Sequence, residues 1–510
     1  MADEVLNNNK RIAVNTILLY VRMLFTMIIS LYTSRVILRV LGADDFGIYN
    51  VVGGVVVLFS FFTNAMTSST QRFLNYNLGL KDDSVVSRVF STSMLTHFTI
   101  FLIVLFLAET VGLWFVITQL NIPSGREEAT IWVYQMSVIT TLIGIMVIPY
   151  RSSIIAAEKM SIFAYVSVVE VVLKLLVVLI LPYISYDSLI VYSILLTLVA
   201  LLTFFIYQIE CRRKLSFTKY HFVWDKNQYK EMMTFSGWYL FGGMAVVGAK
   251  QGTNILINIF YNVTLNAAVG IANQVRNAVY GFVSNFQTAF NPQIVKLYAA
   301  KDNEQLLALL YRSSKFSYYL LFVISFPVIL FCDDILSIWL ENVPDYAAIF
   351  TRLVIITSFT DALSAPLWTA IGATGKVQRY QVLVSLIIIL DVPAVYIAFK
   401  LGMNATSAFI INLFVSIIAY LYRLLYIRKF ITYRIRDYFK KVSLPCFIVT
   451  ILSIPLPCLL SYYCDTVMKT IFLVIGTIFT SGMITLFVGL DRSEKQYVKM
   501  LFNKMLKIKL

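Results

Sequence analysis

The segment Asp187–Lys214 reads DSLIVYSILLTLVALLTFFIYQIECRRK. Its apolar run is long enough to cross a membrane, because a spanning helix needs about 20 mainly apolar residues at about 1.5 Å of rise per residue. The run ends on Arg212, Arg213 and Lys214, and a basic cluster of this kind is typical of the cytoplasmic end of a span. This segment therefore predicts a helical membrane protein.

The composition extends this prediction to the whole chain. Of the 510 residues, 59% are apolar and 14% are charged, whereas a typical soluble domain has about 45–50% apolar and about 25% charged residues. One soluble core cannot hold this excess, because such cores stop growing near about 250–300 residues. The five cysteines, an odd number, also exclude a disulfide-rich secreted domain. We predict an all-α polytopic membrane protein.

The predicted spans follow from length and hydropathy. Residues 1–10 are polar and lack the basic start of a cleaved signal peptide, so the first span is expected to remain in the protein. Fourteen segments qualify as spans, centred on 12–34, 46–66, 90–116, 130–150, 161–182, 187–209, 233–260, 266–290, 316–336, 347–371, 379–399, 405–427, 443–463 and 468–490.

The lysines and arginines predict the orientation of these spans. The chain has 42 of them and a net charge of +15. Most lie in the segments that share a side with both termini, and cytoplasmic segments are the ones that carry this excess. Both termini are therefore expected to be cytoplasmic.

An internal repeat organises the predicted helices. The stretch Gly47–Asn50 (GIYN) matches Gly270–Asn273 (GIAN), and Lys81–Asp83 (KDD) matches Lys301–Asn303 (KDN), a spacing of roughly 220 residues. Six helices separate the copies, which predicts two six-helix lobes related by a pseudo-two-fold axis along the membrane normal. The predicted parts are an N-lobe (1–210), a cytoplasmic linker (211–232), a C-lobe (233–430), two further helices (431–490) and a basic amphipathic tail (491–510).

Polar residues inside the spans gather on single helix faces. A cation at the bilayer centre costs about 2.5–3.5 kcal/mol unless it meets water, a partner or a ligand. We predict that these faces line a water-filled cavity, where cations bind phosphate and amides bind sugar hydroxyls. The alternative is a buried hydrogen-bonded seam between helices. The predicted cavity residues are the cations Arg22, Lys250, Arg276, Lys174 and Arg35, and the polar residues Asn15, Thr26, Asn254, Asn258, Asn273 and Asn277.

Two acidic residues inside the spans are candidates for ion coupling, Glu170 and Asp391. Glu170 lies one helical turn before Lys174, so a local ion pair is the simpler interpretation of both residues. Asp391 is the counterpart of Lys174 in the predicted repeat. Arg352 and Arg423 lie near span ends, where extension of the side chain to the membrane surface is expected.

Several classes of enzyme leave no signature in the chain. The sequence has no P-loop, no GxSxG, no HExxH and no dinucleotide fingerprint. We therefore expect no ATP hydrolysis, no cofactor and no metal site, and a protein that is not an enzyme. A membrane-embedded polysaccharide polymerase or ligase is disfavoured, because the predicted outer loops are short.

The sequence resembles the Wzx-type flippases of bacterial polysaccharide biosynthesis, in the multidrug/oligosaccharidyl-lipid/polysaccharide exporter superfamily. The resemblance rests on the 6+6+2 helix plan and on three stretches, Ser34–Gly42 (SRVILRVLG), Asp45–Tyr49 (DFGIY) and Ala289–Ile294 (AFNPQI). It implies the two-lobe MATE-like fold and a location in the bacterial inner (plasma) membrane.

The resemblance also implies a substrate. Such a flippase moves a polyprenyl-pyrophosphate-linked oligosaccharide from the inner to the outer leaflet by alternating access, for O-antigen, capsule or exopolysaccharide synthesis. The expected partners are this lipid-linked oligosaccharide, membrane lipids and other polysaccharide-assembly membrane proteins, and nucleic acid is not expected. The alternative is a cation-coupled multidrug or small-solute antiporter of the same fold.

Overall fold

The structure is a computed structural model. It describes residues 14–495 apart from 31, 34–35, 38–39, 42–44, 46–47, 50–51, 53–59, 81–82, 120–124, 262, 341–342, 456–466 and 493. Every regular element within these ranges is a helix, as predicted. The chain divides into two compact units, residues 11–243 and residues 244–510. The boundary falls inside one long helix, α8 (Lys226–Phe260).

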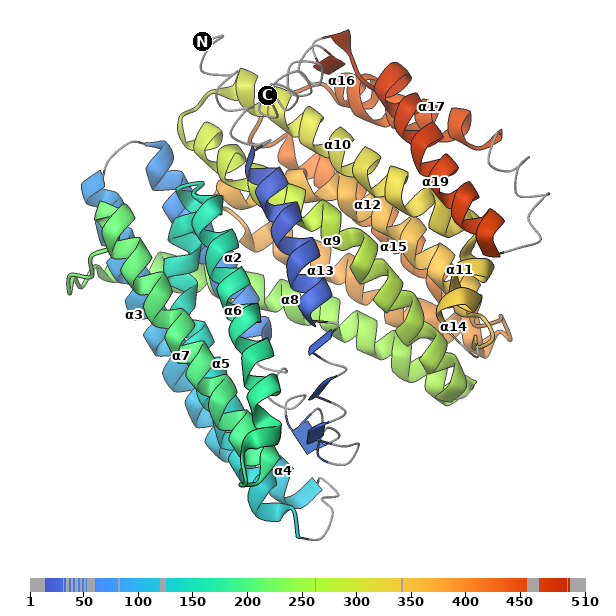
Figure 1. The fold of residues 1–510 in the computed structure, drawn as a ribbon. Helices are drawn as coiled ribbons and strands as arrows, with labels where there is room; N and C mark the ends of the chain where they lie inside the picture. Colours follow the sequence, from blue (N-terminus) through green and yellow to red (C-terminus); the bar gives the residue numbers. More distant parts are fainter. Residues whose placement is uncertain are drawn as a thin grey trace, which may run out of the picture. The chain divides into compact units, whose positions relative to one another are not determined.

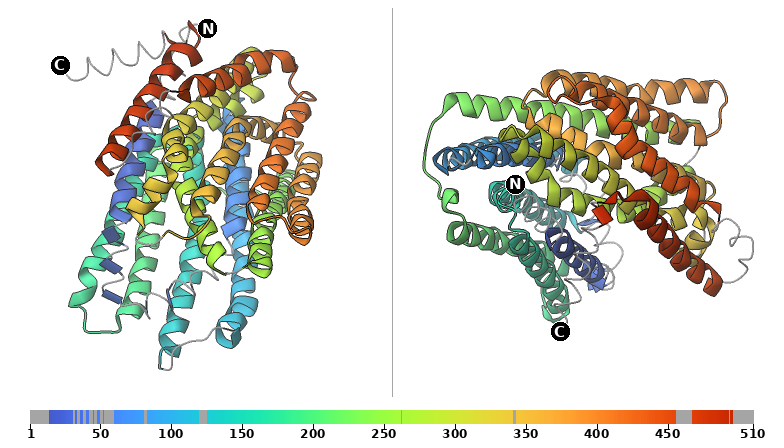
Figure 2. Two further views of the ribbon diagram at one scale, coloured as in Figure 1. Left: turned by 90° about the vertical axis from the view of Figure 1, so that its right-hand side faces the viewer. Right: turned by 90° about the horizontal axis from the view of Figure 1, so that it is seen from above.

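The first unit is a bundle built around α5. The interior positions of α5, including Tyr134, Val138 and Ile145, are almost fully buried. This helix packs along α7, and the two run side by side in Figures 1 and 2. The helices of this unit are the stretch Val14–Ser30, α2 (Ser60–Gly79), α3 (Asp83–Leu107), the π-helix η1 (Ala108–Gly112), α4 (Leu113–Gln119), α5 (Glu127–Ala156), α6 (Met160–Ile180), the 3₁₀ turns η2 (Leu181–Tyr183) and η3 (Ser216–Thr218), and α7 (Ser188–Lys214).

The second unit is built around α12. This helix packs against α9, α10 and α15, and its Phe350 meets Phe409 with ring centroids 4.3 Å apart. The helices are α9 (Val263–Ala299), α10 (Asn303–Leu330), α11 (Cys332–Trp339), α12 (Ala347–Ala373), α13 (Gln378–Ile389), α14 (Asp391–Lys400), α15 (Thr406–Ile427), α16 (Ile435–Tyr438), the π-helix η4 (Phe439–Ser443), α17 (Leu444–Ser453), α19 (Val467–Ile484) and the π-helix η5 (Thr485–Gly489).

The last helices dock on α10. The hydroxyl of Tyr319 donates a hydrogen bond to the carbonyl of Gly489 (3.0 Å). One turn away, Lys315 forms an ion pair with Glu494 at 2.7 Å, and both side chains are buried. Figures 1 and 2 show α10 and α19 lying next to each other within this unit. The C-terminal helices are therefore part of the second unit.

Ten helices of the described residues are long and apolar enough to cross a membrane, and a shorter apolar helix covers Val14–Ser30. The chain is a multi-pass membrane protein. The predicted span 266–290 forms part of α9, which is not among the ten because its Asn, Gln and Ser residues lower its hydropathy. The predicted spans 46–66 and 443–463 fall partly on residues outside the described ranges. The predicted count of fourteen stays a prediction.

One span of the second unit is interrupted at a single residue. Residues 378–400 form two helices, α13 and α14, that meet at Leu390, whose backbone is itself right-handed helical. Pro393 lies just after this residue and has no N–H to continue the hydrogen-bond ladder of a helix. The interruption places Asp391 at the first position of α14. This position puts a carboxylate inside a span.

Candidate functional site

The second unit contains a cavity of about 420 Å³ between α8, α9, α12, α13, α14 and α15. This volume lies within the range of about 300–1,000 Å³ that is typical of small-molecule sites. The lining residues are Val246, Ala249, Lys250, Thr253, Asn254, Val269, Asn273, Arg276, Tyr280, Val354, Thr357, Asp361, Trp368, Ile388, Asp391, Ala408, Phe409, Asn412, Val415, Ser416, Ala419 and Arg423.

Helical periodicity explains why these residues share a cavity. The α9 residues Val269, Asn273, Arg276 and Tyr280 are separated by four, three and four positions, so they lie along one face of that helix. The α8 residues of the lining, Val246, Ala249, Lys250, Thr253 and Asn254, recur every three or four positions and also share one face. The cavity is thus formed by single faces of these helices, which carry polar residues together with apolar ones such as Val246, Val354 and Phe409.

A charge network crosses the cavity wall from α9 to α12. The Arg276 guanidinium forms an ion pair with Asp361 at 2.9 Å and donates a second hydrogen bond, at 2.9 Å, to the hydroxyl of Ser358. The same guanidinium lies over the ring of Tyr280, 5.2 Å from its centroid. Arg276 is therefore held in place by three neighbours and has a carboxylate as its counter-ion.

The second carboxylate of the cavity is Asp391, which is 1% exposed. It accepts a hydrogen bond from the hydroxyl of Thr253 at 3.0 Å. This contact depends on a close approach of α8 to α14, since a Cβ atom added at Gly252 would lie 2.8 Å from Val392. Glycine at this position lets the two helices meet.

Arg423 corrects a sequence-based expectation. It was expected to extend to the membrane surface, but it is 8% exposed and lines the cavity. Its Nε donates a hydrogen bond to the hydroxyl of Tyr380 at 3.0 Å. The prediction was wrong because position along a helix does not reveal which face is turned inward. Arg352 does not line the cavity. Its guanidinium donates hydrogen bonds to the carbonyl of Ile329 and to the carboxylate of Asp333.

Four of the predicted cavity residues line this cavity, together with the predicted ion-coupling residue Asp391. The four are Lys250, Arg276, Asn254 and Asn273. Lys250 has an exposed side chain, and within the described part of the chain we find no ion pair or hydrogen bond for it. Asn277 is exposed on α9 and is not part of the lining. The side chain of Asn258 and the whole of Arg35 lie outside the described residues.

The predicted residues of the first unit that the structure describes make contacts within that unit. Lys174 pairs with Glu170 at 2.6 Å, which is the local ion pair that their spacing predicts. The Arg22 guanidinium lies 4.6 Å from the ring centroid of Phe163. The other two make backbone contacts: the side-chain amide of Asn15 donates to the carbonyl of Glu158, and the hydroxyl of Thr26 donates to the carbonyl of Met23 within its own helix.

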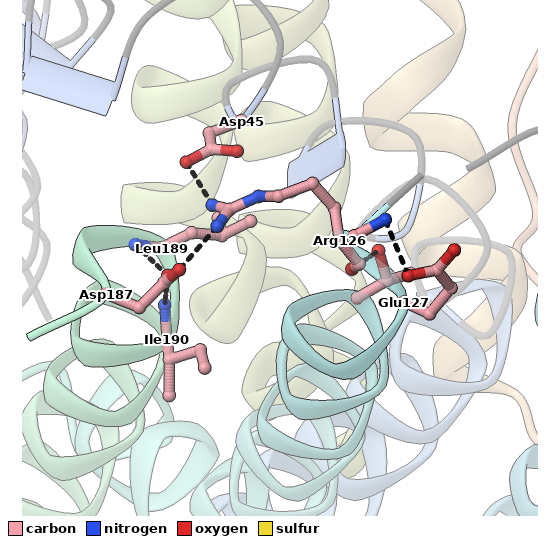
Figure 3. Close-up of polar contacts among 8 residues, drawn as sticks. Asp45, Arg126, Glu127, Asp187, Leu189 and Ile190 are labelled. Carbon is pink, nitrogen blue, oxygen red and sulfur yellow. Dashed lines mark hydrogen bonds and ion pairs between the residues drawn. The ribbon is translucent and has the colours of Figure 1, made fainter. Parts of the chain in front are cut away.

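A second charge cluster lies at the helix ends of the first unit. Figure 3 shows Arg126, which precedes α5, reaching both Asp45 and Asp187. Hydrogen bonding to Asp45 raises the pKa of Arg126. Partial burial alone would raise the pKa of Asp187, but hydrogen bonds from the Ile190 backbone N–H and from Arg126 outweigh it and lower that pKa. Asp187 also caps α7 through the N–H groups of Leu189 and Ile190.

The sequence prediction missed many members of the cavity, among them Trp368, Asn412 and Arg423. The spacing of residues along the sequence could have indicated Trp368. Thr357, Asp361 and Trp368 are separated by four and seven positions, which places them along one face of α12. Only polar and charged residues were predicted to line the cavity, so the tryptophan in this pattern was missed.

Solved structures of membrane transporters share this fold. An outward-facing multidrug resistance MATE family transporter of the MOP superfamily matches with a TM-score of 0.71 and 13% identity over 83% of this chain and 96% of that chain. The MATE transporter ClbM, in complex with Rb⁺, gives a TM-score of 0.68 and 14% identity over 85% and 97%. A MOP superfamily transporter from Pyrococcus furiosus gives 0.67 and 13% over 82% and 96%. At these identities the similarity shows the fold, which is that of MATE-type membrane transporters.

The sequence itself identifies the family. The family model described as "Polysaccharide biosynthesis protein" matches residues 12–298, which is more than half of the chain. The protein belongs to this polysaccharide biosynthesis family. No curated protein matches the sequence significantly.

Proposed function

We propose that the protein is a flippase. It moves polyprenyl-pyrophosphate-linked oligosaccharide repeat units from the inner to the outer leaflet of the bacterial inner membrane by alternating access, for surface polysaccharide biosynthesis. The observation that carries the proposal is the charged and amide-lined cavity of the second unit, in a chain of the polysaccharide biosynthesis family. Both termini are cytoplasmic in this proposal.

The cavity suits such a cargo in its chemistry. Asn254, Asn273 and Asn412 offer amide donors and acceptors together, and hydroxyl-rich ligands need both. Arg22, Lys174 and Arg35 belong to the proposed cationic path by prediction from the sequence. In this path the cations bind the anionic part of the cargo, and the prenyl chain stays in the lipid.

The test is made in cells. Deleting the gene should leave lipid-linked repeat units on the cytoplasmic side and remove polysaccharide from the surface, and re-expression should restore both. Arg22→Ala should abolish surface polysaccharide while the protein remains in the membrane, and Arg22→Lys should retain part of the activity because the charge is kept. Normal surface polysaccharide in the deletion strain would refute the proposal.

The second candidate function is a cation-coupled antiporter of drugs or small solutes. One observation favours it, the buried carboxylate of Asp391 beside Thr253 inside a span. The structural relatives include a multidrug resistance transporter and a transporter in complex with Rb⁺. Efflux of cationic drugs that disappears in Asp391→Asn, with polysaccharide export intact, would favour this alternative.

A further inference from the structure

The three cationic side chains that line the cavity differ in how free they are to bind a ligand. Arg276 already has Asp361 as its counter-ion, and Arg423 is buried against Tyr380. Lys250 differs from both, because its side chain is exposed and the described residues offer it no ion pair. Lys250 is thus the cation of the cavity that is available to a ligand.

The net charge of the lining limits the charge of that ligand. The lining holds three cationic side chains and two carboxylates, Asp361 and Asp391, so its net charge is +1 when all five are ionised. One carboxylate on a ligand brings the occupied cavity to neutrality. A pyrophosphate carries more than one negative charge, and it would leave the occupied cavity with a net negative charge in a medium of low dielectric constant. A singly charged ligand fits the cavity better.

Trp368 adds a second requirement for the ligand, an apolar face. It lies on the face of α12 that carries Asp361, it lines the cavity, and it is 48% exposed. A tryptophan offers a wide apolar face and one N–H donor. A pyranose ring has an apolar face formed by its C–H groups and a rim of hydroxyls. The indole suits the first, and the amides of Asn254 and Asn273 suit the second.

We propose that this cavity is a subsite for one acidic sugar residue of the cargo. Trp368 stacks against the sugar ring, Lys250 pairs with its carboxylate, and the asparagines bind its hydroxyls. The inference rests on the proposed flippase function and deepens it, since it assigns the sugar end of the cargo to the second unit. It also assigns Lys250 to a carboxylate and not to the pyrophosphate.

Intrinsic fluorescence of the purified full-length protein in detergent tests the stacking. The chain has six tryptophans, and a sugar on Trp368 should change the emission of that residue. Addition of D-glucuronic acid should quench fluorescence in the wild type and in Trp339→Phe, but not in Trp368→Phe. Trp339 is the matched control, because it is 47% exposed in the same unit and does not line the cavity. Quenching that persists in Trp368→Phe would overturn the stacking.

The same titration tests the charge. Lys250→Met should raise the half-saturating concentration of D-glucuronic acid at least ten-fold and leave that of D-glucose unchanged, and Lys250→Arg should bind nearly as the wild type does. Equal binding of glucose and glucuronic acid by the wild type would show a neutral-sugar site and overturn the proposal. Inorganic pyrophosphate that saturates the wild type at a lower concentration than glucuronic acid, and loses this binding in Lys250→Met, would also overturn it, because Lys250 would then belong to the pyrophosphate.

Different results would refute the acidic-sugar subsite and the flippase function. Absence of any glucuronic acid binding, in a protein whose deletion abolishes surface polysaccharide, refutes the acidic-sugar subsite and leaves the flippase function standing. Normal surface polysaccharide in the deletion strain refutes the flippase function whatever the sugar titration gives.

Discussion

Replacing Glu494 by glutamine should be one of the most damaging single changes in the second unit. The carboxylate accepts a hydrogen bond from Lys315 at 2.7 Å and another from the backbone N–H of Asp491 at 2.9 Å. The side chains of Lys315 and Glu494 are 7% and 2% exposed. Removing one member of a buried pair leaves an uncompensated charge, at a cost of about 3–5 kcal/mol. At about 2–4 °C per kcal/mol, Tm should fall by roughly 6–20 °C.

Thermal unfolding of the purified protein in detergent measures this cost. A thiol-reactive dye can report it, because Cys211, Cys332 and Cys446 are buried in the folded protein. Adding Lys315→Met to Glu494→Gln should restore much of the stability, since no buried charge is then left unpaired. The matched control is Lys214→Met, which breaks the more exposed pair of Lys214 with Glu210 and should cost at most about 1 kcal/mol.

Two results would refute the reasoning about this pair. The first is a Glu494→Gln variant as stable as the Lys214→Met control, which would mean that the ion pair is solvated. The second is a double variant that is less stable than Glu494→Gln alone. Salt supplies a further check, because a buried pair is screened much less than an exposed one. The destabilisation should therefore change little between low and high salt.

Three further predictions concern packing and charge. Gly489→Ala should cost about 1–3 kcal/mol, because the added Cβ would lie 2.8 Å from the ring of Tyr319; an unchanged Tm would contradict the close approach. Phe350→Ala removes a fully buried ring and should cost about 3–5 kcal/mol in the same assay, and a loss below about 1 kcal/mol would contradict tight packing there. Because the pKa of Asp187 is lowered in the folded protein, its contribution to stability is present at neutral pH and is lost as the pH falls through that lowered pKa. The Tm difference between wild type and Asp187→Asn should stay constant from pH 7 to about 5 and shrink below about pH 4, and a difference that grows on acidification would refute this.

The sequence predicted one part of the site well, and a local property of helices explains why. Lys250 and Asn254 are four positions apart, and Arg276 follows Asn273 by three. The period of an α-helix places such residues on one face whatever the rest of the chain does. All four line the same cavity. A polar face on a membrane helix can therefore be found without knowledge of the fold.

The partners of these residues could not be predicted in the same way. Asp361 is 85 positions from Arg276, and Asp391 is 138 positions from Thr253. Which carboxylate meets which donor depends on how helices pack, and hydropathy does not encode the rotation of one helix against another. For the same reason Arg423 was predicted from the sequence to extend to the membrane surface, whereas the structure places it in a buried position beside Tyr380.

The sequence alone determined that the chain crosses a membrane as helices, because its apolar segments are about 20 residues long and a helix of that length satisfies its own backbone hydrogen bonds in lipid. It also determined which helices carry polar faces, since that follows from spacing along the chain. Only the tertiary structure decided that Arg276 has Asp361 as its counter-ion, whereas Lys250 has none among the described residues. The physical reason is that a cationic side chain can bind a ligand when no carboxylate of the protein neutralises it. Whether a carboxylate lies beside it depends on helices that are far apart in the sequence.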